Sequence, residues 1–139
     1  MKRTICFLLI ICNLCSLTTI AQTSSLKVVA KVSNEISNNL HQKGRIFLFV
    51  SDSNIREPRM NTWPNKSNMI FAVNIENWEA GKSFTFDNSV PFVKSVDLSL
   101  DKIPNGKYKI QVLWDQDTNE SSINAPGNLY SEAITLDLS

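Results

Sequence analysis

Apolar and polar residues alternate along much of the chain, in short runs separated by turns. In residues 108–114 they fall on opposite faces, with Tyr108, Ile110, Val112 and Trp114 on one face and Lys109 and Gln111 on the other. A period of two is typical of a half-buried β-strand. Pro104 and Gly106, just before this run, favour an abrupt reversal of the chain. A tyrosine so soon after such a turn is typical of the tyrosine corner of β-sandwiches, in which the phenol bonds to upstream backbone.

Similar patterns predict further strands at residues 26–32, 83–87, 96–100 and 131–138, and two strands apolar on both faces at residues 45–50 and 69–75. Pro91 restricts residues 90–93 to an edge strand or a loop. Residues 52–68 and 115–129 have no periodicity and are predicted to be long loops, which often carry function. About seven short strands and almost no helical pattern predict an all-β fold, an antiparallel two-sheet sandwich of the immunoglobulin-like or fibronectin-like kind. A small barrel is the alternative.

The N-terminus has the three parts of a secretory signal peptide. Lys2 and Arg3 precede an uncharged apolar run at residues 5–17, and small residues follow up to Ala21. This order predicts cleavage after Ala21. The apolar run is shorter than the roughly 20 residues that span a bilayer. We therefore expect residues 1–21 to be a signal peptide, and residues 22–139 to be a secreted or periplasmic domain without a transmembrane segment.

Cleavage would change the chemistry available to the chain. All three cysteines, Cys6, Cys12 and Cys15, lie in residues 1–21, so the mature domain has no disulfide, thiol nucleophile or cysteine-based zinc site. Removing Lys2 and Arg3 from the 14 basic residues leaves 12 against 13 acidic ones, a formal net charge of –1. Without a basic excess, we expect no nucleic-acid partner.

Several short motifs between residue 44 and the end of the chain occur in an order that supports a family resemblance. They are Gly-Arg-Ile-Phe-Leu-Phe at 44–49, Arg-Glu-Pro-Arg at 56–59, Ile-Phe-Ala-Val at 70–73, Trp78, Gly-Lys at 81–82, Ile-Pro-Asn-Gly-Lys-Tyr-Lys-Ile-Gln at 103–111 and Ala-Pro-Gly-Asn-Leu-Tyr-Ser at 125–131. Together they resemble the N-terminal β-rich module that precedes putative-esterase (α/β-hydrolase) domains in secreted bacterial proteins. The resemblance implies an exported accessory module. It implies no catalytic residue, because the family's catalytic apparatus lies in the downstream hydrolase domain.

The residues of the chain do not favour an enzyme. A Ser-His-Asp hydrolase needs a base and a nucleophile on a strained turn, but the chain has a single histidine, His41, and no Gly-x-Ser-x-Gly motif. A solvated loop position is the simpler interpretation of His41. We expect no catalytic residue and no cofactor.

One loop has part of a calcium-binding pattern. Asp115, Asp117 and Asn119 have the spacing of the first three ligands of a calcium loop. Glu120 and Pro126 stand where that loop needs glycine and glutamate. The simpler interpretation is a polar turn between two strands, so we expect no metal site.

The candidate binding residues are in or beside the two long loops: Arg56, Arg59, Trp63 and Trp114. Exposed tryptophan beside arginine is typical of a surface that binds a protein or a glycan. Alternatively, the tryptophans pack over the ends of the sandwich while the arginines pair with Glu57 and nearby acids.

These patterns predict an exported, non-catalytic β-sandwich that acts as an accessory or interaction module, with a protein or a glycan as its partner. One alternative is a calcium-assisted carbohydrate-binding module that uses Trp63, Trp114 and the acidic loop. Another is a small hydrolase related to the esterase module.

Overall fold

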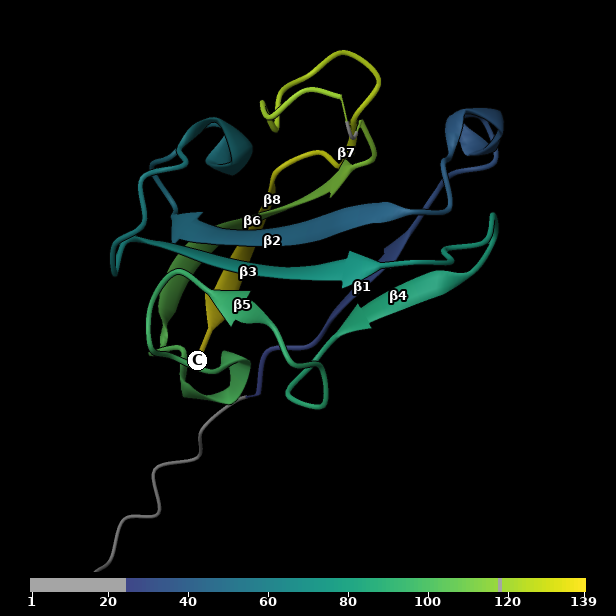
Figure 1. Ribbon diagram of the computed structural model, residues 1–139. Helices are drawn as coiled ribbons and strands as arrows, with labels where there is room; N and C mark the ends of the chain where they lie inside the picture. The colour runs from purple at the N-terminus through teal and green to yellow at the C-terminus, as the bar shows by residue number, and fades with distance from the viewer. Residues whose placement is uncertain (1–24, 118) are drawn as a thin grey trace, which may run out of the picture.

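The protein is an all-β sandwich of two antiparallel sheets (Figure 1). The computed structural model describes residues 25–117 and 119–139, so the predicted signal peptide at residues 1–21 lies outside the described residues. Within the part that is described, no helix is long and apolar enough to cross a membrane. The predicted fold class is confirmed.

The larger sheet has six strands, in the order β5-β3-β2-β6, with β7 and β8 both paired to β6. These strands are β2 (Gly44–Asp52), β3 (Asn68–Ile75), β5 (Val93–Lys94), β6 (Gly106–Asp115), β7 (Leu129–Tyr130) and β8 (Ile134–Leu138). Strands β7 and β8 pair with opposite ends of β6, because Leu129 lies opposite Trp114 whereas Leu138 lies opposite Gly106. The short segment between β7 and β8 therefore runs beside the middle of β6.

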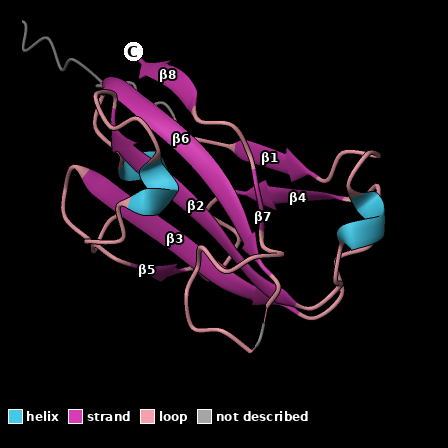
Figure 2. Cartoon of the chain, turned by 90° about the horizontal axis from the view of Figure 1, so that it is seen from above, coloured by secondary structure: helices cyan, strands magenta, loops and turns pink. Residues whose placement is uncertain are grey.

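Within residues 25–117 and 119–139, the smaller sheet has only two strands, β1 (Val28–Lys31) and β4 (Ser83–Phe86). They cross the strands of the larger sheet obliquely, as the two views in Figures 1 and 2 show. Side chains from both sheets form the core between the layers, including Ile46, Leu48, Phe71, Phe86 and Trp114. Period-two alternation places these residues on the inner face of their strands.

The outer face of the larger sheet is also covered. The 3₁₀ helix η2 (Pro58–Met60) packs on β2 and β6. Beneath it lie the buried outer-face side chains of Phe49 and Leu113. Gln111, which the alternation places on the polar face of β6, is only 2% exposed. It is buried because the loop between β2 and β3 folds back over the sheet.

Two predictions need correction. Residues 96–100 form no strand, because their backbone turns on itself: the Leu98 N–H bonds to the Val96 carbonyl at 2.8 Å. The 3₁₀ helix η3 (Leu100–Lys102) follows and places Leu100 in the core. Strand β7 forms at the end of what was predicted to be a loop. A third 3₁₀ helix, η1 (Ser37–Asn39), lies between β1 and β2.

Candidate functional site

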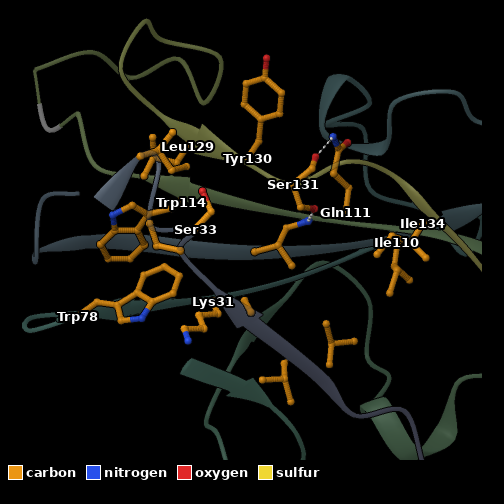
Figure 3. A pocket seen from close by; sticks show the side chains of 16 residues that line it. Lys31, Ser33, Trp78, Ile110, Gln111, Trp114, Leu129, Tyr130, Ser131 and Ile134 are labelled. Carbon is orange, nitrogen blue, oxygen red and sulfur yellow. Dashed lines mark hydrogen bonds between the residues drawn. The ribbon is translucent and has the colours of Figure 1, made fainter. Parts of the chain in front are cut away.

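An apolar groove lies along one side of the sandwich, between β1 and the β6, β7 and β8 side of the larger sheet (Figure 3). Its volume is about 330 Å³. The groove exists because the smaller sheet has two strands and the larger sheet six, so that no strand of the described residues lies above part of the larger sheet's inner face. The lining residues come from β1 and the turn after it, from the middle of β6, and from the segment that joins β7 to β8.

Two tryptophans form one end of the groove. The rings of Trp78 and Trp114 meet edge to face, with their centroids 5.0 Å apart. Both indole N–H groups are already bonded to backbone: Trp78 donates to the Lys82 carbonyl at 3.0 Å, and Trp114 donates to the His41 carbonyl at 3.1 Å. The tryptophans therefore contribute aromatic carbon surface to the groove and no free donor.

Aliphatic side chains form the floor and the far wall. Ile110 and Val112 lie on the inner face of β6, and both are only partly buried. Leu129 and Ile134 flank them from β7 and β8. Ile134 is 58% exposed, although its position opposite Ile110 places it on the inner face. A sheet position that normally packs in the core is thus open to solvent here.

The segment between β7 and β8 is held firmly against β6. Ser131 makes two hydrogen bonds with the backbone of Val112. The Ser131 N–H donates to the Val112 carbonyl at 2.9 Å, and the Ser131 Oγ accepts from the Val112 N–H at 3.0 Å. Gln111 donates to the Ser131 carbonyl at 2.9 Å and accepts from the Arg59 N–H at 3.0 Å. These bonds fix the far wall of the groove and occupy the polar atoms of Gln111 and Ser131.

Few polar groups remain free to meet a ligand. Lys31 is the only charged residue among those that line the groove, and it forms no ion pair within the described part of the chain. The other available groups are the Ser33 hydroxyl and the backbone of β1, which pairs only with β4 among the described strands. The groove thus combines an apolar floor with one unpaired strand edge.

The structure separates the four residues that the sequence proposed as a binding site. Trp114 is 2% exposed and contacts the groove from inside the core. Trp63 is 77% exposed in the loop between β2 and β3, where Arg56 is also exposed. Neither Trp63 nor Arg56 lines the groove. The four side chains do not converge on one surface.

Arg59 lies on the outer face of the larger sheet, where neighbouring side chains hold its guanidinium group. Its Nη2 lies 3.0 Å from Glu57 Oε2, and its Nη1 donates to Asn124 Oδ1 at 2.7 Å. The guanidinium also lies 3.8 Å from the centroid of the Tyr130 ring. Figure 3 shows this ring directed away from the groove. These contacts join the two long loops across the outer face of β6 and β7.

The acidic loop is bonded internally. Asp115 Oδ1 accepts from Asn128 Nδ2 at 3.0 Å, and Asp117 Oδ1 accepts from the Asn119 N–H at 2.8 Å. Burial raises the pKa of Asp115 above its ordinary value, against the lowering effect of the Asn128 bond. Within residues 25–117 and 119–139, no three His, Cys, Asp or Glu side chains are placed so that they could hold a metal ion. His41 is exposed, and its backbone N–H donates to Gln116 Oε1 at 2.8 Å.

The groove residues Ile110, Val112 and Ile134 were not predicted to form a site from the sequence. Their alternation marks them as inner-face positions, which carries the expectation of a filled core. No local pattern in the sequence indicates that a covering strand is lacking.

Comparisons with protein-family models, with curated proteins and with solved structures found no match to this chain.

Proposed function

We propose that this protein is an exported, non-catalytic β-sandwich module that acts by binding, and that the groove between β1 and β6 is its binding surface. The observation that carries the proposal is the uncovered inner face of the larger sheet, where Ile110, Val112 and Ile134 remain accessible. Apolar surface of this kind is costly to leave in water, at roughly 25 cal/mol per Å². Concave apolar surfaces with a few polar groups are the usual form of a ligand site.

The size and the lining of the groove support this role. Its volume, about 330 Å³, is within the range of about 300–1,000 Å³ that is typical of ligand sites. The walls are fixed by the Ser131 and Gln111 hydrogen bonds. A preformed site loses little conformational entropy when it binds.

The N-terminus supports export. The basic start, the apolar run at residues 5–17 and the small residues up to Ala21 make a secretory signal the simplest interpretation of residues 1–21. The resemblance to the module that precedes putative-esterase domains is consistent with an accessory role. The proposal assigns no catalytic residue.

The test uses residues 22–139 and the fluorescent apolar probe 1-anilinonaphthalene-8-sulfonate. We expect saturable binding to the folded wild-type protein and a loss of that binding in the Ile134→Asp variant, which places a charge on the groove wall. Met60→Asp is the matched control, because Met60 is 59% exposed and lies on the outer face, away from the groove. Near-UV circular dichroism establishes that each variant is folded, because loosely packed states also bind the probe.

Failure to bind the probe would contradict the proposal. Equal losses in Ile134→Asp and Met60→Asp would also contradict it, because the probe would then report general surface hydrophobicity rather than the groove.

A further inference from the structure

We propose that the occupant of the groove is an extended strand of another polypeptide, which pairs antiparallel with the free edge of β1. This inference rests on the proposed function of the groove and adds the class of its partner. The larger sheet supplies an inner face wide enough for more than two facing strands, whereas the smaller sheet stops at β1. The partner would supply the next strand of the smaller sheet.

The backbone of β1 has an edge that is not paired with any described strand. Its register with β4 runs from Val28 opposite Phe86 to Lys31 opposite Ser83, and no other described strand pairs with it. In an antiparallel pair, the N–H and C=O groups of alternate residues point away from the partner strand. Half of the β1 backbone groups therefore face the open side, where another strand can satisfy them.

The side chains of β1 alternate between the inner and the outer face of the smaller sheet. Val28 and Ala30 point inward and are partly buried, whereas Val29 and Lys31 are exposed, as alternation in a strand requires. An added strand would continue this alternation, so that every second side chain would face the floor at Ile110 and Val112. Apolar residues at every second position of the partner therefore match the groove.

Charge favours a different chain over a second copy of this one. If two β1 strands paired antiparallel about Val29, Lys27 of each copy would stand directly opposite Lys31 of the other. Like charges directly opposite each other destabilise a pair of strands. A partner strand with an acidic residue opposite Lys31 would instead pair with the one charged side chain that the described residues contribute to the groove lining.

The probe for this proposal is a synthetic peptide of about eight residues, acetylated and amidated, with Glu at its first position followed by alternating Val and Thr. Antiparallel pairing places the first residue of the peptide beside the C-terminal end of β1, at Lys31. Binding is followed by tryptophan fluorescence in a Trp63→Phe background, so that the signal comes from Trp78 and Trp114 at the end of the groove.

Two N-methylated versions of the peptide test strand pairing separately from apolar contact. One is methylated at the Val amides and the other at the Thr amides, so that each blocks a different edge of the strand while both keep the side chains. We expect one version to bind roughly tenfold or more weakly than the parent, because it loses hydrogen bonds to β1, and the other to bind as the parent does.

Lys31→Gln tests the charge contact. We expect it to weaken binding of the Glu peptide by roughly two- to fivefold and to abolish the difference between that peptide and its Gln analogue. Lys27→Gln is the matched control, because Lys27 is exposed at the other end of β1 and does not line the groove. Residue-resolved hydrogen exchange adds an independent readout: the bound peptide should protect alternate amides of β1.

Each outcome of these experiments supports or overturns the proposal. Equal affinity of the two methylated peptides for the protein, or loss of binding with both, would overturn strand pairing. If 1-anilinonaphthalene-8-sulfonate binds in the groove but the parent peptide does not, the strand proposal fails while the proposed function of the groove stands. If neither probe binds, both proposals fail.

Discussion

The phenol of Tyr108 donates a hydrogen bond to the carbonyl oxygen of Pro104, 2.8 Å away and four residues upstream. This bond closes the reversal that leads into β6, and it confirms the tyrosine corner that the Pro104 to Gly106 turn predicted. The ring of Tyr108 also packs against the core. The longest strand of the larger sheet thus begins at a turn that is held by one of its own side chains.

We expect Tyr108→Phe to lower the free energy of unfolding by about 1 kcal/mol, because it removes this hydrogen bond and keeps the ring. Chemical denaturation, compared through the transition midpoint and slope, measures the change. Tyr130→Phe is the control, since the Tyr130 ring is exposed and keeps its stacking on Arg59 without the hydroxyl. Equal effects of the two substitutions would show that the Tyr108 bond contributes nothing specific.

Gly44→Ala is expected to destabilise the protein by roughly 1–3 kcal/mol through overpacking. A Cβ on Gly44 would overlap the carbonyl oxygen of Asp115 and lie 2.8 Å from Cζ2 of Trp114. The neighbouring strand and the indole ring would have to move apart. Gly106→Ala is the comparison, because a Cβ there would lie no closer than 3.5 Å to the Tyr108 side chain. Thermal unfolding of the two variants should rank Gly44→Ala as the less stable.

Asp115 makes the stability of the fold depend on pH. Burial raises the pKa of its carboxyl group in the folded protein, so the folded state disfavours the ionised form. The folded protein therefore binds the proton more tightly than the unfolded chain does, and stability falls as the pH rises through the unfolded and then the folded pKa. Asp115→Asn should be more stable than wild type at pH 7, and the difference should vanish below about pH 3.

The Asn side chain can still accept the bond from Asn128 Nδ2, so this variant isolates the charge. Asp137→Asn, at an exposed position of β8, serves as the control. An Asp115→Asn variant that is less stable than wild type at pH 7 would show that attraction to Arg45 outweighs burial.

Gln111→Leu should cost roughly 1–3 kcal/mol, because it leaves the Arg59 N–H and the Ser131 carbonyl without their partner. Both groups lie under the outer loops, where Gln111 itself is 2% exposed. Lys109→Leu, two residues earlier on the same face of β6, is the control. Denaturation midpoints check the stability, and a wild-type midpoint in Gln111→Leu would mean that water replaces the lost bonds.

Export of the full-length protein should yield a mature chain that begins at Gln22. Mass spectrometry of the protein recovered outside the cytoplasm measures its N-terminus. Ala21→Arg should block cleavage at this position, because the site needs a small residue. A chain recovered intact from the cytoplasm alone would contradict the proposed compartment.

Local sequence patterns were enough to predict much of the fold. The residues of β2, β3 and β6 could be predicted because period-two alternation and continuous apolar runs depend only on neighbours in sequence. Residues 96–100 were predicted to be a strand for the same reason, and they are not one. Their apolar side chains belong to a turn and to the start of a 3₁₀ helix, which places Leu100 in the core. An alternating pattern states which side chains are buried, but it does not state that the backbone pairs.

The candidate site was less accessible to such reasoning. Trp114 was proposed as an exposed binding residue beside the second long loop, and the structure buries it against Trp78, which is 36 positions earlier in the chain. Arg59 was proposed for binding and instead stacks on Tyr130, a residue of strand β7. These contacts join segments that are distant in sequence, so no local pattern predicts them.

The sequence by itself determined most of the strand-forming segments, the turn at Pro104 to Gly106 and the tyrosine corner, because backbone preferences and alternation are local properties of the chain. Only the tertiary structure decided how many strands each sheet recruits and which faces are covered. Pairing Val28 with Phe86 forms a sheet of only two strands, and this long-range choice leaves the inner face of β6 open beside β1. The groove results from that mismatch between the sheets, which depends on the whole arrangement of strands.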